Sequence, residues 1–115
     1  MATRSVTVDQ STQRSVLATW TGLLNGDDGG PFEGGDWGDR TAQITGTFGV
    51  GGSISLEGSN DGTNYVVLTD PQGNAITKTA AGIEAVIELP RYIRPRVTAG
   101  DGSTSLTCTL YMVRR

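Results

Sequence analysis

The sequence predicts one all-β domain, an antiparallel β-sandwich or jelly roll of about seven or eight short strands. Apolar and polar residues alternate in short runs, which is the two-residue period of half-buried strands. Turn-forming clusters of Gly, Asn, Asp and Pro separate these runs every ~8–12 residues. The chain has 17 glycines among 115 residues and lacks the long Ala, Leu, Glu and Lys runs that helices use. A closed barrel with a similar number of strands is the alternative.

The N-terminal segment, residues 1–14, is polar and holds Val6 and Val8 as its sizeable apolar pair. We expect it to be an arm that is ordered only when it docks on something. The sandwich domain then comprises residues 15–115, and residues 15–24 form its first strand.

Residues 25–39 are rich in glycine and acidic residues, which predicts a long loop without regular structure. Loops longer than ~12 residues in a compact domain are usually functional or disordered. Phe32 and Trp37 favour a functional loop. Trp37 is expected either to anchor an interface or to fold back and close one end of the sandwich.

The remaining strands are separated by turns. The clearest hairpin has its turn at Ser59–Asn64, where Asn, Asp and Gly tolerate the positive φ angles of tight turns. Pro95 within a strand indicates an edge position or a bulge. The further strands are expected at residues 40–48, 53–57, 65–68, 75–79, 83–89, 92–98 and 106–113. The predicted core comprises Ile44, Phe48, Ile54, Leu56, Ile83, Ile87, Leu106, Cys108 and Leu110.

The composition argues against an enzyme. No histidine is present, which removes the usual general base and the commonest metal ligand. Cys108 is the only cysteine, and its inward phase predicts a buried small side chain and not a nucleophile. We therefore expect no catalytic residues, no cofactor and no metal, although the acidic turn Asn60–Asn64 leaves calcium as a weaker alternative.

Charge and hydropathy also constrain the partners and the cellular location. No apolar run approaches the ~18 residues that a membrane span requires, and the N-terminus lacks the apolar core of a signal peptide. The pI of ≈ 4.7 argues against nucleic acid. A cytosolic site of synthesis is expected.

Charges of opposite sign are separated along the chain. Residues 25–39 hold five acids and no base, whereas residues 91–115 hold five arginines and one acid. Such a layout suits contact with charged protein surfaces, including another copy of this chain. Arg94 and Arg96 are expected either to contact a partner or to form a solvated face. The candidate partner-binding residues are Arg4, Val6, Val8, Phe32, Trp37, Arg94 and Arg96.

The segment from about residue 40 to residue 115 resembles small all-β virion proteins of tailed bacteriophages, and most closely capsid decoration (cement) proteins. The phrases that carry the resemblance are Gly52–Tyr65, Asp70–Asn74, Arg91–Pro95 and Thr104–Leu110. It implies a virion protein on the head surface that clasps neighbouring major capsid subunits, often as a homotrimer, after synthesis in the bacterial cytoplasm. The alternatives are a carbohydrate-binding β-sandwich module of a fibre or enzyme, and a tail or head-completion protein.

Overall fold

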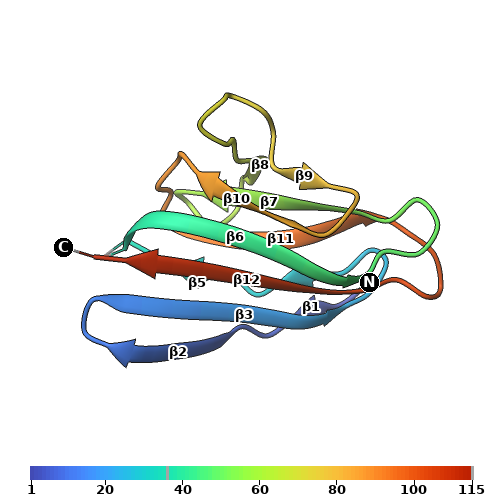
Figure 1. Ribbon diagram of the computed structural model, residues 1–115, viewed down its shortest axis with the longest axis horizontal. Coiled ribbons are helices and arrows are strands. Elements are labelled where there is room, and N and C mark those ends of the chain that lie inside the picture. The colour runs from blue at the N-terminus through green and yellow to red at the C-terminus, as the bar shows by residue number, and fades with distance from the viewer. Residues whose placement is uncertain (36, 115) are drawn as a thin grey trace.

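The protein is a β-sandwich, with two sheets packed face to face (Figure 1). The computed structural model describes residues 1–35 and 37–114, and these residues contain no helix. Consequently no helix long and apolar enough to cross a membrane occurs among them. The molecule measures 41 × 29 × 27 Å. The fold class that the sequence predicts is confirmed.

Several strands in the described part of the chain are only two residues long, so the sheets contain more strand segments than the sequence predicts. The segments are β1 (Thr3–Arg4), β2 (Thr7–Thr12), β3 (Ser15–Leu23), β4 (Asp28–Gly29), β5 (Phe32–Glu33), β6 (Gly38–Thr47), β7 (Ser53–Ser59), β8 (Val66–Val67), β9 (Thr77–Lys78), β10 (Gly82–Val86), β11 (Tyr92–Ala99) and β12 (Ser105–Val113).

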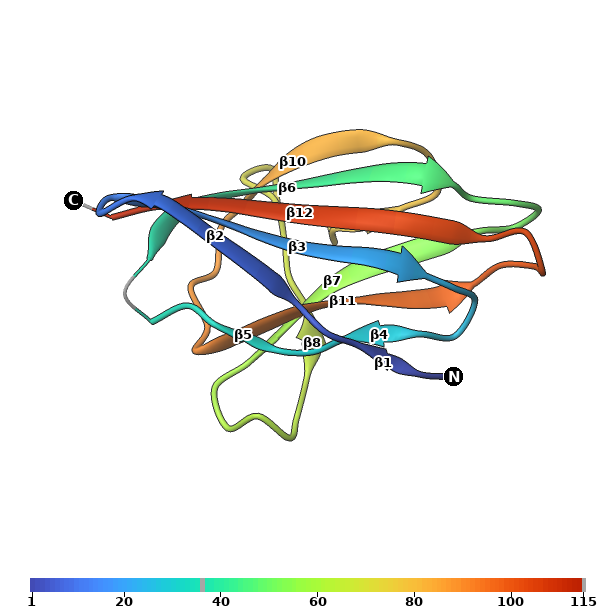
Figure 2. The same cartoon turned by 90° about the horizontal axis from the view of Figure 1, so that it is seen from below.

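The two sheets differ in composition and order. The seven-stranded sheet has the order β1-β4-β11-β7-β8, with β5 also pairing with β11 and β9 with β7. The five-stranded sheet has the order β10-β6-β12-β3-β2, which Figure 2 shows as a fan of strands. Described pairs are antiparallel except β1 with β4, which is parallel. The sandwich therefore has β8, β9 and β10 along one side and the N-terminal strands along the other.

The N-terminal segment, residues 1–14, is part of both sheets in the structure. β1 pairs with β4 in the seven-stranded sheet, and β2 pairs with β3 in the five-stranded sheet. Between them, Val6 is partly buried and packs against the core. The surface on which this arm docks is thus the sandwich of the same chain.

Residues 25–39 contain two short strands, so the prediction that this stretch lacks regular structure is wrong for β4 and β5. Both strands pair with β11, one after the other. Gly29 lies against the ring of Trp20, where an added Cβ would approach Trp20 Cδ1 to 2.6 Å. At this position glycine permits close packing between the sheets.

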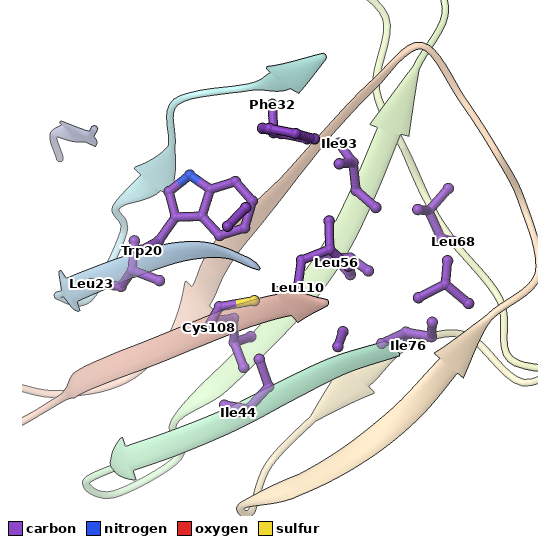
Figure 3. Close-up of a cluster of buried hydrophobic side chains, with 14 of the residues drawn as sticks. Trp20, Leu23, Phe32, Ile44, Leu56, Leu68, Ile76, Ile93, Cys108 and Leu110 are labelled. Atoms are coloured by element: carbon purple, nitrogen blue, oxygen red, sulfur yellow. The ribbon is translucent and has the colours of Figure 1, made fainter. Parts of the chain in front are cut away.

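The core lies between the sheets, as Figure 3 shows for its labelled residues. β12 runs through the middle of the five-stranded sheet and directs Leu106, Cys108 and Leu110 inward. The seven-stranded sheet contributes Ile54 and Leu56 from β7. Of the remaining predicted core residues, Ile44 is buried and Phe48 is partly buried against the same cluster.

The prediction is wrong for Ile83 and Ile87, which are more than half exposed, and Val86 is buried in their place. The error has a physical cause, because the residues that alternate with Ile83 and Ile87 include Glu84 and Glu88 as well as Val86. β10 is an edge strand, so both acids can reach polar partners at the side of the sandwich. Lys78 Nζ donates to Glu84 at 2.7 Å, and Thr69 donates through its backbone and its hydroxyl to Glu88.

Pro95 is buried within β11, which is a central strand and not an edge strand. The strand partners of β11 on one side are β4 and β5, and they are separate segments. They pair at Arg96 and at Ile93 respectively, so Pro95 lies opposite the gap between them. A residue without an N–H is tolerated there because the neighbouring ladder is interrupted.

Candidate functional site

The outer face of the seven-stranded sheet carries a network of buried and half-buried charges. β11 directs Arg94 and Arg96 outward, and both guanidinium groups meet Glu57 on β7. Arg94 Nε donates to Glu57 Oε1 at 3.2 Å, and Arg96 Nη1 donates to Oε2 at 3.4 Å. Arg94 Nη1 also reaches Asp28 Oδ2 at 3.3 Å. The Glu57 side chain is 6% exposed, so its charge depends on these two arginines.

Arg94 is further covered by Tyr65. Its guanidinium carbon lies 3.8 Å from the centroid of the Tyr65 ring, a cation–π contact. Burial raises the pKa of the Tyr65 hydroxyl above its ordinary value. Arg94 is therefore held within the protein, whereas the Arg96 side chain is 52% exposed and remains available for a partner.

Asp27, Asp28 and Glu33, three acids of residues 25–39, are paired with basic residues of the same chain. Arg4 Nε donates to Asp27 Oδ2 at 2.8 Å, and Arg91 Nε donates to Glu33 Oε2 at 2.9 Å. Burial alone would raise the pKa of Asp27, but hydrogen bonds from the backbone N–H groups of Leu24 and Ala2 and from Arg4 together lower it. Another of the five acids, Asp36, lies outside the described residues.

This pairing changes the interpretation of the separated charges. The acidic segment and the basic C-terminal segment lie far apart in the sequence, yet they meet across β4, β5 and β11. The attraction that the charge layout predicts between molecules therefore acts, for these pairs, within one molecule.

The two aromatic residues proposed as contacts pack inward. Phe32 is buried in the core, so its side chain is not available to a partner. Trp37 is partly buried against the same core, and the guanidinium carbon of Arg114 lies 4.6 Å from its ring centroid. The buried Arg40 holds the turn before Trp37, since its Nη2 donates to Gly34 O at 2.8 Å and to Trp37 O at 3.2 Å. Of the two alternatives for Trp37, packing back onto the sandwich is the one observed.

The predicted partner-binding residues do not converge on one site. Arg94 and Arg96 share Glu57 on the outer face of the seven-stranded sheet. Arg4 belongs to β1, at the edge of the same sheet, where β1 pairs with β4. Val6 faces the core, whereas Val8 on the edge strand β2 is exposed. Val8 and Arg96 thus remain the most accessible of the predicted contacts.

An apolar groove that the sequence analysis missed lies beside β8. Its volume is ≈ 410 Å³, and Val66 and Leu89 on its rim are 68% and 62% exposed. A signal was present, because two adjacent valines in β8 cannot both face inward. The residues that line the groove are Gly58, Ser59, Asn60, Asn64, Val66, Leu68, Glu88, Leu89 and Pro90.

The turn next to this groove is organised by Asp61. Its carboxylate accepts hydrogen bonds at 2.8 Å from the Ser59 hydroxyl, from the backbone N–H groups of Thr63 and Asn64, and from the Asn64 amide. Hydrogen bonds from the turn hold the pKa of Asp61 far below its ordinary value. The Ser-Asn-Asp-Gly-Thr-Asn phrase is thus explained by turn geometry.

The described residues offer little reactive chemistry. Cys108 is completely buried, and burial raises the pKa of its thiol to about 12. In the described part of the chain, no group of three or more His, Cys, Asp or Glu side chains is arranged to hold a metal ion.

Most aromatic rings are also unavailable for stacking on a ligand. Arginines cover a face of Tyr65, Tyr92 and Trp37. Trp20 is buried, and its indole nitrogen donates to Gly30 O at 2.8 Å. Among the described rings, Tyr111 is the large aromatic that is classed as exposed.

Comparison with known proteins establishes the fold. No family model matches the sequence, and a search of curated proteins also finds no match. Among solved structures, the chain is similar to the SPBc2 prophage-derived protein YomS, with a TM-score of 0.66 and 11% identity, over 91% of this chain and 99% of that one. A cupin domain from Bordetella pertussis Tohama I matches with a TM-score of 0.51 and 14% identity, over 96% and 92% of the two chains. At these identities the likeness concerns the jelly-roll type of sandwich.

Proposed function

We propose that this protein is a non-enzymatic virion structural protein that decorates a bacteriophage head by binding the major capsid protein lattice. The observation that carries the proposal is the exposed apolar groove beside β8. Exposed Val66 and Leu89 around a preformed hollow are typical of a surface that receives a side chain of a protein partner. The amide side chains of Asn60 and Asn64 supply a polar edge to the same groove.

The groove favours a protein partner over the alternative, a carbohydrate. Sugar-binding sites use exposed aromatic faces as stacking platforms, and among the described residues no aromatic side chain lines this groove. The arginines that cover Tyr65, Tyr92 and Trp37 remove three further candidate platforms.

Two further observations support a place in the virion. The fold is similar to that of a prophage-derived protein over nearly the whole of both chains. The sequence phrases that resemble decoration proteins include the Asp61 turn at the groove, so the resemblance and the candidate surface fall on the same part of the molecule. Many copies, each contacting two or more capsid subunits, would make shell opening require many contacts to break together.

Binding to heads that lack the protein tests the proposal. Purified protein is expected to bind such heads and to raise the temperature at which they disrupt, because a ligand that binds only the intact state stabilises it. Leu89→Ser and Val66→Ser are each expected to weaken binding by about tenfold. Val50→Ser is the matched control, since Val50 is an exposed valine in the turn between β6 and β7.

The outcomes separate the alternatives. Unchanged head stability together with tight binding to a glycan array would transfer the function to carbohydrate recognition. Equal losses for Val50→Ser and the groove variants would remove the groove as the contact.

Self-association belongs to the same proposal. The resemblance implies a homotrimer, and light scattering on the isolated protein should then give three times the 12.0 kDa mass of one chain. A mass of 12.0 kDa at all concentrations would instead indicate a protomer that meets its neighbours only on the head.

A further inference from the structure

The outward face of the five-stranded sheet is rich in threonine and is called here the threonine face. The strand register places its side chains in rows. One row runs from Thr7 through Thr19, Thr109 and Gln43 to Ile83, and all five strands contribute to it. The other described members of the face are Asp9, Ser15, Leu17, Thr21, Thr41, Thr45, Thr47, Ala85, Ser105, Thr107, Tyr111 and Val113.

Among its described residues, the threonine face carries charge near its margins, at Asp9 on β2 and at Asp39, which is exposed at the irregularity near the start of β6. Alternation along β3, β12 and residues 41–47 gives each segment an inward apolar set and an outward set of uncharged residues. Asp9 lies on the edge strand β2. In a chain with 9 Lys or Arg and 12 Asp or Glu residues, an uncharged centre of this breadth is a distinctive feature.

The hydroxyl of Ser15, at the start of β3, bonds the Thr12 hydroxyl at 2.8 Å, but the threonine hydroxyls of the central strands lack side-chain partners among the described residues. The threonines of β6 and of β12 make no side-chain hydrogen bond there, and Thr19 and Thr21 of β3 make none either. On the other sheet, Thr3 donates to Asp28 at 2.7 Å, and the hydroxyls of Ser55 and Thr77 bond each other at 2.9 Å. A hydroxyl both donates and accepts, so a face of hydroxyls is complementary to a copy of itself.

The size and apolar content of the face also suit a contact between copies. Five strands spaced ~4.8 Å apart and about seven residues long present on the order of 550 Å². Two such faces would bury roughly 1,100 Å², which reaches the lower range for a specific interface. Tyr111 near the centre is 47% exposed and Ile83 at the margin is 58% exposed, so both side chains gain from burial.

We propose that the threonine face is the surface through which one copy of this chain binds a second copy. The uncharged centre of this face meets its own copy without placing like charges together and without desolvating an ion. The ion-paired outer face of the other sheet would have to do both. A face that meets its own copy forms a two-fold contact, so the inference predicts a dimer in place of the homotrimer that the resemblance implies. It is tested on the isolated protein, so its result does not depend on head binding.

Thr109→Arg tests the inference because Thr109 lies on the central strand, between Thr19 and Gln43. The wild-type protein is expected to have twice the 12.0 kDa mass of one chain in size-exclusion chromatography with light scattering. Two facing arginines repel, so the variant is expected at 12.0 kDa with an unchanged circular-dichroism spectrum. Thr98→Arg, on an exposed strand threonine of the other sheet, is the matched control and should keep the wild-type mass.

A charge-swap experiment separates a lost interface from a damaged fold. Thr109→Glu alone should also be monomeric, whereas an equimolar mixture with Thr109→Arg should recover associated species. If Thr109→Arg does not fold, Gln43→Arg at the adjacent exposed position replaces it.

Three results would overturn the inference. The first is a wild-type mass of 12.0 kDa up to ~100 µM, a concentration far above the Kd of a stable oligomer. The second is a wild-type mass for folded Thr109→Arg. The third is a monomeric protein whose binding to a glycan array is lost in Tyr111→Ala, which would assign the face to a sugar.

Discussion

The outer faces of the two sheets are stabilised in opposite ways. On the seven-stranded sheet, Glu57 is enclosed by Arg94 and Arg96, and Tyr65 covers Arg94. These charged groups find partners inside the molecule. On the five-stranded sheet, the described threonines of β3, β6 and β12 are uncharged and make no side-chain hydrogen bond within the described part of the chain.

This difference suggests that one face stabilises the fold and that the other binds another molecule. A face whose charges are paired within the chain contributes to the stability of the fold, and it loses that contribution when one partner is removed. A face of unbonded hydroxyls contributes little to folding and keeps its hydrogen-bonding capacity for another molecule. Substitutions on the first face should therefore change the free energy of unfolding, and substitutions on the second should change association.

The largest expected effect comes from the core side of β12, the strand whose opposite side belongs to the threonine face. Leu110 is completely buried, and Leu110→Ala is expected to lower the free energy of unfolding by about 2–5 kcal/mol through lost burial and a cavity. Its neighbour Thr109 points outward on the same strand, and Thr109→Ala should change that free energy by less than about 0.5 kcal/mol. Urea denaturation of both variants measures the difference. A loss under about 1 kcal/mol for Leu110→Ala would contradict its burial.

A smaller effect is expected when a charge is removed from one face and added to the other. Glu57→Gln keeps the shape of the side chain but leaves Arg94 and Arg96 without their shared carboxylate, and should cost about 2–3 kcal/mol. Gln43→Glu makes the reverse change on the exposed threonine face, and should alter the free energy of unfolding by less than about 0.5 kcal/mol. Urea denaturation at low protein concentration compares the two. Equal costs would mean that the two faces do not differ in the way described.

The sequence was sufficient for the fold class and for the strands with a clear two-residue period. In β12 the alternation assigned Cys108 and Leu110 to the core correctly, because one phase is apolar and the other is hydroxylic. In β10 the same method failed. Both phases there hold apolar residues, and the edge position allows Glu84 to turn to Lys78.

The candidate surfaces depended on information that is not local in the sequence. The Arg94–Glu57 pair requires the register between β7 and β11, and the partners are 37 residues apart. The row that contains Thr19, Thr109 and Gln43 likewise appears only when β3, β12 and β6 are aligned. Separated charges were visible in the sequence, but the sequence did not show that Asp27 and Arg4 pair within one molecule.

The smallest expected effect is the response to acid, which is tested at a carboxylate in the turn between β11 and β12. Asp101 accepts hydrogen bonds from the backbone N–H groups of Val50 and Ser103 and from the Ser103 hydroxyl, and these lower its pKa to about 2. A carboxyl whose pKa is lower in the folded state than in the unfolded state stabilises the fold fully above its unfolded pKa of ~3.9. That contribution is lost as the pH falls from about 4 to about 2.

The free energy of unfolding should therefore decrease as the pH falls through this window, and Asp27, whose pKa is also lowered, should add to the decrease. Asp101→Asn is expected to flatten the dependence, since asparagine does not titrate. Thr107→Asn places the same amide on the threonine face and removes no titratable group, so its dependence should parallel that of the wild type. Urea denaturation at several pH values between 5 and 2 compares the slopes. A slope for Asp101→Asn identical to that of Thr107→Asn would show that the Asp101 turn does not contribute to acid sensitivity.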